Sequence, residues 1–419
     1  MRSSKRAYSV IFSVPALLTA CLFVTGCGGS SSTPPQTVAT SGQNVMPLTV
    51  DAGPDNNYVN GAFASVTVCV PGSSTCQTID GVLVDTGSYG LRILNSVLTI
   101  SLPGQKSGGS QVGECAGFAD GITWGGVHTA DIQLGGETAQ SVPIQVIGDS
   151  AVPATAPSDC SSMGTPEDTL QTLLANGILG VGQFPQDCGL GCTTQGNPTP
   201  PAGTYYTCST SSCSNSFESL SQQVQNPVSL FATDNNGVIV ELPSIGPSGA
   251  PSVSGSLVFG IGTQSNNGLG SASVFTLDPT TGNLTTQYKG QSYSSSFIDS
   301  GSNGIFFLNH DLTQIPVCGS NTNAPGFYCP DSTEDLSATN VGANGTTGNV
   351  DFSVANANTL VSSGNVAYND LAGENTPPPS QPSSSTGFDW GLPFFFGRNV
   401  YTAIAGASTP AGAGPYYAY

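Results

Sequence analysis

Apolar and polar residues alternate with a period of two over short segments along most of the chain. This period is typical of β-strands that bury one face. Clusters of Gly, Pro, Ser and Asn separate the segments, as turns do. The pattern predicts strands at 61–70, 76–84, 91–100, 143–147, 255–262, 273–277, 288–298 and 305–308, a hairpin at 121–134, two strands within 226–242 and further alternation at 347–368.

Only residues 167–174 are predicted to form a helix in the first half of the chain, with Thr165 as its cap and Glu167 and Asp168 in its first turn. With 54 Gly and 30 Pro among 419 residues, short strands and turns are favoured. The length exceeds that of one comfortable core. We therefore expect an all-β chain with short helices, divided into lobes at 49–245 and 246–419.

The first 27 residues combine a basic start, an apolar stretch and small residues before a cysteine, which is typical of a signal peptide. Two tetrapeptides, ending at Cys21 and Cys27, resemble a bacterial lipobox, and Cys27 fits better because it leaves a longer apolar region. Residues 28–48 then form a flexible tether. The expected location is outside the cytoplasm, with a lipid anchor on the outer membrane or the periplasmic face.

The remaining ten cysteines are an even number, as expected for disulfides in an oxidising compartment. Zinc is disfavoured because the two histidines, His128 and His310, adjoin no cysteine pair; we expect no metal site and no cofactor. Cysteines that are close in sequence predict four bridges: Cys69–Cys76, Cys188–Cys192, Cys208–Cys213 and Cys318–Cys329. The fifth, Cys115–Cys160, follows by elimination only.

The chain carries 26 acidic and 7 basic residues, a formal net charge of −19. Such a charge repels phosphate backbones, so nucleic-acid binding is not expected. The same charge favours solubility, and it also suits acidic surroundings, where protonation relieves the repulsion.

Two distant segments, Val84-Asp85-Thr86-Gly87-Ser88 and Ile298-Asp299-Ser300-Gly301-Ser302, each place an aspartate in a hydroxyl-rich turn after apolar residues. Two carboxyl groups in contact cannot both ionise cheaply, so they share a proton. Such a pair can activate a water molecule for attack on an amide carbonyl.

The residues around each aspartate suit this chemistry. Glycine lets the backbone approach the carboxylate, and the last serine can hydrogen-bond its outer oxygen. The hydroxyl after each aspartate can link the two loops. These supporting residues are Thr86, Gly87, Ser88, Ser300, Gly301 and Ser302.

The two turns resemble the active-site loops of pepsin-like aspartic proteases, and the similarity extends over roughly residues 60–405. The chain is also similar to a group of uncharacterised exported bacterial lipoproteins. The resemblance implies a two-lobed double-psi β-barrel fold with Asp85 and Asp299 as the catalytic pair. Further matching stretches are Ile178-Leu179-Gly180, which packs behind the first loop, and 226–231, 255–260 and 398–404.

The chain departs from this family in two places. The second apolar-apolar-Gly element, within 390–397, has its glycines out of step. The family's flap hairpin usually presents a tyrosine over the pair, and none matches between Gly113 and Gly126; Phe118 and Trp124 are the candidates for its role.

The expected function is an exported aspartic endopeptidase that acts on protein or peptide substrates as a monomer. A Ser-His-Asp hydrolase is disfavoured because no Gly-x-Ser-x-Gly turn is present. The main alternative is a pepsin-fold binding or inhibitory lipoprotein of the cell envelope without catalysis.

Overall fold

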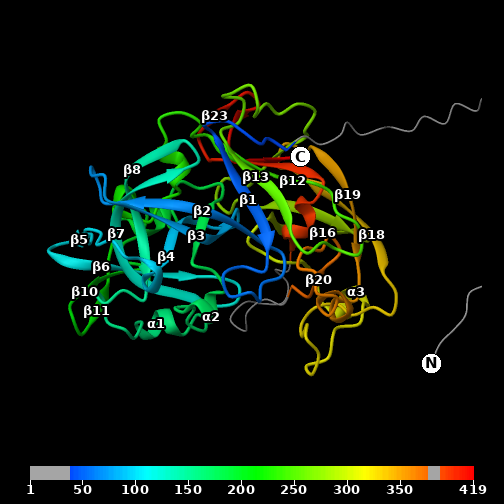
Figure 1. Cartoon of the computed structure of the whole chain (residues 1–419), viewed down its shortest axis with the longest axis horizontal. Helices are drawn as coiled ribbons and strands as arrows, with labels where there is room; N and C mark the ends of the chain where they lie inside the picture. The colour runs from blue at the N-terminus through cyan, green and yellow to red at the C-terminus, as the bar shows by residue number, and fades with distance from the viewer. Residues whose placement is uncertain (1–37, 376–386) are drawn as a thin grey trace, which may run out of the picture. The chain divides into compact units, whose positions relative to one another are not determined.

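The computed structural model describes residues 38–375 and 387–419 (Figure 1). The expected signal peptide, both candidate lipidation cysteines and residues 28–37 of the expected tether lie outside these ranges. Within them, no helix has the length and apolar composition needed to cross a membrane.

Strands dominate the described chain, so the expected all-β composition with short helices is confirmed. The helices are short turns: α1 (Ser158–Ser161), α2 (Leu170–Leu173), α3 (His310–Thr313) and α4 (Ala357–Val361). The strands are β1 (Val45–Asp51), β2 (Gly61–Cys69), β3 (Cys76–Asp85), β4 (Tyr89–Leu94), β5 (Lys106–Ser107), β6 (Ser110–Gly117), β7 (Ile122–Leu134), β8 (Glu137–Ile147), β9 (Gly177–Val181), β10 (Tyr205–Cys208), β11 (Cys213–Asn215), β12 (Gly237–Leu242), β13 (Val253–Phe259), β14 (Val274–Thr276), β15 (Leu284–Tyr288), β16 (Gln291–Ile298), β17 (Ile305–Phe307), β18 (Glu334–Val341), β19 (Thr347–Val354), β20 (Ala372–Gly373), β21 (Phe388–Trp390), β22 (Arg398–Ala403), β23 (Ser408–Thr409), β24 (Gly412–Ala413) and β25 (Tyr416–Ala418).

The strands form two large sheets. The first runs in the order β11-β10-β6-β7-β8-β4-β9-β3-β2-β1-β13-β12-β22-β25-β14, and the second in the order β19-β18-β15-β16-β21-β17-β20. In Figure 1, β2 to β8 lie on the left, β16 and β18 to β20 on the right, and β1, β12 and β13 between them. Because β1 pairs with both β2 and β13, the first sheet contains strands from both sides of residue 245. The lobe boundary at 245/246 stays a prediction.

The two sheets repeat one strand arrangement. In the first, β9 lies between β3, to which it is parallel, and β4, to which it is antiparallel; β4 in turn pairs in parallel with β8. In the second, β21 lies in the same way between β16 and β17, and β17 pairs in parallel with β20. Each arrangement ends its first strand at one of the two aspartate turns.

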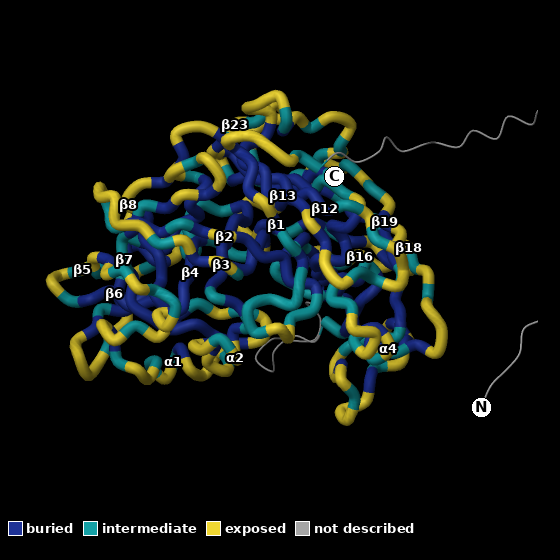
Figure 2. The backbone as a smooth tube through the Cα atoms, viewed as in Figure 1, coloured by how far each residue is buried: buried dark blue, intermediate teal, exposed yellow. Residues whose placement is uncertain are grey.

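The central strands β12 and β13 consist almost entirely of buried residues, as Figure 2 shows. In the second sheet the core is aromatic: Phe307, Phe352, Phe388 and Trp390 pack with ring centroids 5.1 to 6.4 Å apart. Contacts of this kind add to the hydrophobic burial of large rings. The site loops therefore rest on rigid strands.

All five expected disulfides are present, so the predicted pairing is confirmed. Cys69 and Cys76 face each other across β2 and β3, and Cys208 and Cys213 across β10 and β11. The Cys115–Cys160 bridge joins β6 to α1 across 45 positions of sequence.

Several local predictions were wrong. The helix is α2, which is four residues long, and Thr169 caps it through a reciprocal contact with Thr172. Residues 122–134 form one strand that pairs with β8 across the turn at 135–136. Within 226–242 the first expected strand is a 3-10 turn, Pro227–Leu230, because the Asn226 side chain accepts the Val228 N–H. In each case a local side-chain contact or long-range pairing overrode the alternation pattern.

Candidate active site

Asp85 and Asp299 lie side by side although 214 positions separate them. The Gly87 N–H is 2.7 Å from Asp85 Oδ1 and 3.0 Å from Asp299 Oδ1, so one backbone amide contacts both carboxylates. Asp85 is 6% exposed, whereas Gly87 is exposed. The pair is thus accessible from one side and within reach of a single water molecule.

Each carboxylate is also held by its own turn. Asp85 accepts the Ser88 N–H at 3.1 Å and the Ser88 hydroxyl at 2.5 Å. Asp299 accepts the Gly301 N–H at 2.7 Å and contacts Ser302 Oγ at 2.9 Å. The expected roles of the glycine and the last serine are both seen in the geometry.

Thr86 and Ser300 link the two turns beneath the carboxylates. The Thr86 hydroxyl accepts the Ser300 N–H at 2.9 Å and donates to the Ile298 carbonyl at 3.3 Å. The Ser300 hydroxyl accepts the Thr86 N–H at 3.2 Å and donates to the Val84 carbonyl at 2.7 Å. Both side chains are fully buried, so these four reciprocal bonds fix one turn against the other.

The model of a family of proteins of unknown function, DUF3443, matches residues 40–419. The chain belongs to this family. A comparison with curated proteins finds no match. Among solved structures, the chain is similar to an aspartic proteinase from Irpex lacteus, with 16% identity, a TM-score of 0.49, and coverage of 89% of this chain and 96% of that one. The strand order and the paired turns described above confirm the all-β class with short helices for this DUF3443 protein, in which two similar strand arrangements each end at an aspartate turn.

The electrostatic environment favours a proton on Asp299. Burial is the first cause that raises its pKa well above the usual range, followed by the negative charges of Asp85 and Asp389. The Gly301 N–H opposes this shift. Of the two central carboxyls, Asp299 is therefore the one favoured to hold a shared proton.

Asp389 was not among the residues predicted from the sequence; it lies in β21 and contacts Ser302 Oγ at 2.6 Å.

The second apolar-apolar-Gly element lies within 390–397 as expected, but the prediction that its glycines are out of step was wrong. Ile298 pairs with Trp390 just as Val84 pairs with Leu179, so Trp390-Gly391 is in step with Leu179-Gly180. An added Cβ at Gly391 would lie 2.6 Å from the Ser302 carbonyl oxygen, which explains the glycine.

The hairpin of β6 and β7 places the two flap candidates differently. Trp124 is 5% exposed, packs edge-on against Tyr206 and donates to the Pro153 carbonyl at 2.8 Å. Its side chain belongs to a buried cluster of the hairpin. Phe118 is half-buried at the turn, and the Arg92 guanidinium lies 5.8 Å from its ring centre.

A tyrosine in another loop lies within electrostatic range of the pair. Tyr58 packs edge-on against Phe63, and burial raises its pKa, followed by the charges of Asp120, Asp85 and Asp299. Asn60, two positions further along, is fully buried and donates to the Tyr368 carbonyl of the second half at 2.9 Å. The loop between β1 and β2 is thereby held near the carboxylates, and its sequence gave no sign of this.

The hairpin turn contributes a carboxylate rather than an aromatic ring. Burial raises the pKa of Asp120, and the charge of Asp85 adds to the shift. Nearby Glu167, which was expected in a helix, is 9% exposed, and burial together with Asp120 raises its pKa to about 8.

Among the described residues, no hydrogen bond joins either histidine ring to a serine hydroxyl. His128 contacts Asp149 through Nε2 at 2.6 Å and the Leu102 carbonyl through Nδ1 at 3.1 Å. His310 Nδ1 lies 2.8 Å from the Ile315 carbonyl. Across the described residues, no three His, Cys, Asp or Glu side chains are arranged to hold a metal ion.

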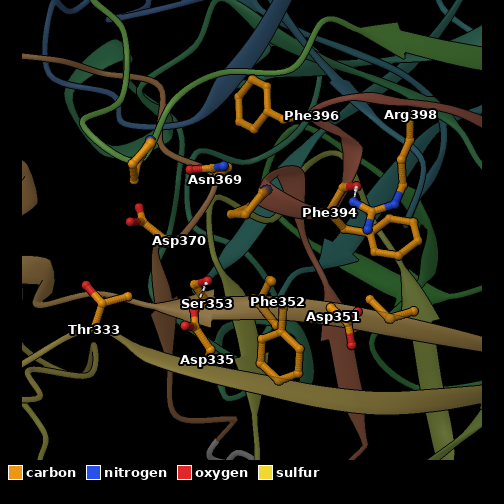
Figure 3. A pocket seen from close by; sticks show the side chains of 14 residues that line it. Thr333, Asp335, Asp351, Phe352, Ser353, Asn369, Asp370, Phe394, Phe396 and Arg398 are labelled. Atoms are coloured by element: carbon orange, nitrogen blue, oxygen red, sulfur yellow. Dashed lines mark hydrogen bonds between the residues drawn. The ribbon is translucent and has the colours of Figure 1, made fainter. Parts of the chain in front are cut away.

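A hollow of about 440 Å³ lies elsewhere, over β18 and β19 (Figure 3). Asp335 and Asp351 line it, and Asp335 accepts the Ser353 hydroxyl at 2.7 Å. At its other side Arg398 donates to the Phe394 carbonyl at 2.6 Å. Neither Asp85 nor Asp299 lines this hollow, so it is separate from the candidate active site.

Proposed function

We propose that this chain is an aspartic endopeptidase in which Asp85 and Asp299 hydrolyse peptide bonds with one activated water molecule. The observation that carries the proposal is the single Gly87 N–H that contacts both carboxylates. Two carboxyl groups that contact the same N–H lie close enough to share one proton, which leaves one base and one acid at the same place.

The two groups have separate roles in the reaction. Asp85 removes a proton from the water as the water oxygen attacks the carbonyl carbon, while Asp299 gives its proton to the carbonyl oxygen. The tetrahedral intermediate then collapses: the C–N bond breaks, the proton held by Asp85 passes to the leaving nitrogen, and one hydroxyl proton of the intermediate returns to Asp299, which restores the starting state. Ser88 and the backbone amides hold the carboxylates in place for both steps.

The location remains part of the proposal. An exported, monomeric protein anchored through a lipid on Cys27 would meet protein or peptide substrates in the cell envelope. The five disulfides support an oxidising compartment. The anchor is tested by Cys27→Ser, which should release the protein from membranes. If the soluble and membrane-bound amounts of protein are the same for wild type and variant, the anchor is rejected.

The activity is tested with denatured protein as substrate, from acid to neutral pH. Asp85→Asn and Asp299→Asn should each lower cleavage by at least ~10³-fold while the melting temperature stays close to wild type. Asp370→Asn is the matched control, because Asp370 is also a buried aspartate but lies outside the pair. Absence of cleavage by the wild type at every pH would instead favour the binding or inhibitory alternative.

A further inference from the structure

Asp389 occupies a position where the first half of the chain has an apolar residue. In the second sheet Phe297 pairs with Asp389 and Ile298 with Trp390. In the first sheet the corresponding pairs are Leu83 with Ile178 and Val84 with Leu179. Asp389 is therefore the counterpart of Ile178, which is 4% exposed. The two halves differ here by a carboxyl group.

This carboxyl group is connected to the catalytic pair through one hydroxyl. Ser302 Oγ lies 2.9 Å from Asp299 Oδ2 and 2.6 Å from Asp389 Oδ2. A serine hydroxyl has a single hydrogen, so it can donate to only one of these two oxygens. The other contact is favourable only when that carboxyl carries a proton and donates it to Ser302.

The surroundings decide which carboxyl holds this proton. Asp389 is 7% exposed, and its Oδ1 has no hydrogen-bond partner among the described residues. A buried, half-satisfied carboxylate is costly, whereas the neutral acid is not. Burial raises the pKa of Asp389 to about 8; the Ser302 hydrogen bond opposes the shift and the charge of Asp85 adds to it.

The titratable groups facing Asp389 come from three elements. They are Asp299 at the end of β16, Asp85 at the end of β3, and Tyr417 in β25. Tyr417 is fully buried, and burial first, then nearby charges including that of Asp389, raise its pKa well above the usual value, so it stays neutral. The neighbours in the sheet, Phe297 and Phe306, are apolar.

We infer that Asp389 is a third, proton-bearing carboxyl of this site, which acts through Ser302 as a positioning residue that sets the protonation of Asp299. The effect on catalysis rests on the proposed function. The claim that Asp389 carries a proton does not. The resulting chain of groups is Asp389, Ser302, Asp299 and Asp85. It holds two protons where a simple pair holds one.

The third carboxyl changes how the pair responds to rising pH. Once Asp389 loses its proton, its negative charge disfavours a second negative charge on Asp299. The pair therefore keeps its own proton to a higher pH than it would alone. An asparagine at position 389 cannot supply this charge.

The experiment compares wild type, Asp389→Asn and the control Asp370→Asn by two measurements. The first is the pH profile of kcat/KM on a peptide substrate; the alkaline limb of Asp389→Asn should move by about one unit to lower pH, and that of Asp370→Asn should not move. The second is a titration of aspartate side-chain carboxyl groups by ¹³C NMR, which needs no activity. Asp389→Asn should lack one carboxyl that remains protonated at neutral pH in the wild type.

The outcomes separate this inference from the proposed function. An inactive wild type that still shows the extra protonated carboxyl would reject the endopeptidase and keep the inference. An active Asp389→Asn with wild-type pH limbs and an unchanged number of protonated carboxyls would reject the inference and keep the endopeptidase. If Asp389→Asn does not fold, Asp389→Ile, which copies Ile178, replaces it. If neither folds, the wild-type titration decides, because absence of a second aspartate protonated at neutral pH, besides the one of the pair, overturns the inference.

Discussion

The α-carbon of Gly87 faces the carboxyl carbon of Asp299, the aspartate of the other turn. A Cβ added at Gly87 would lie 2.6 Å from Asp299 Cγ, and one added at Gly301 would lie 2.7 Å from Asp85 Cγ. Each half of the chain thus limits the space available to the aspartate of the other half. The glycines are needed for close approach, since neither has a positive φ.

Gly87→Ala and Gly301→Ala should therefore reduce activity by roughly 10²-fold, because displacing either carboxylate by even a fraction of an ångström disturbs the shared water. The melting temperature should change little compared with activity. Gly246→Ala is the control, since an added Cβ there meets nothing within 4 Å. Equal activity in all three variants would show that the separation of the carboxylates is not critical.

Thr86→Val should destabilise the fold by about 1–3 kcal/mol, because it removes one bond to the Ile298 carbonyl and leaves the buried Ser300 N–H without its acceptor. Valine keeps the volume, so the loss reports the hydrogen bonds. Unfolding by urea measures it. Thr78→Val is the control: it removes the exposed hydroxyl contact between Thr67 and Thr78 and should cost less than ~0.5 kcal/mol.

Folding stability should fall as the pH rises from about 4 to about 8. Burial raises the pKa of Asp389 and of Glu167 to about 8 from ordinary values near 4, so the folded state binds more protons than the unfolded state. The stabilisation from these two carboxyl groups is complete below their pKa in the unfolded chain. It is lost as the pH rises through their pKa in the folded protein. Thermal unfolding across this range should show a loss of at least ~2 kcal/mol, and Asp389→Asn should reduce it. A wild type that gains stability toward pH 8 would contradict the assignment.

Removal of the Cys115–Cys160 bridge should cost about 4 kcal/mol, against about 2 kcal/mol for Cys188–Cys192, because the cost grows with the length of chain closed by the bridge. Paired Cys→Ser variants and denaturant unfolding test the difference. The Cys188–Cys192 variant is the internal control for loss of a buried disulfide. A reversed order would show that local strain, rather than chain length, governs the two bridges.

The sequence predicted those features whose cause is local. The Asp-Thr/Ser-Gly-Ser turns place glycine and serine within three residues of each aspartate, so the support of Asp85 and Asp299 can be read from neighbouring positions. Disulfides between neighbouring cysteines follow for the same reason.

The missed residues depend on long-range register. Asp389 reaches the site only because β21 lies between β16 and β17 in one particular alignment, and Tyr58 only because its loop is fastened to the second half through Asn60. One signal was present: Asp389 is the single charged residue within the apolar run 388–397. A charge in a predicted core strand indicates a partner that the alternation pattern cannot identify.

The difference between Ile178 and Asp389 also bears on why one chain contains both halves. Two identical subunits related by a symmetry axis would have either an apolar residue or a carboxyl group at both positions. They could not place a single additional acid beside just one of the two aspartates. Joining two unlike halves in one polypeptide allows the acid and the base to be assigned permanently, each to its own strand.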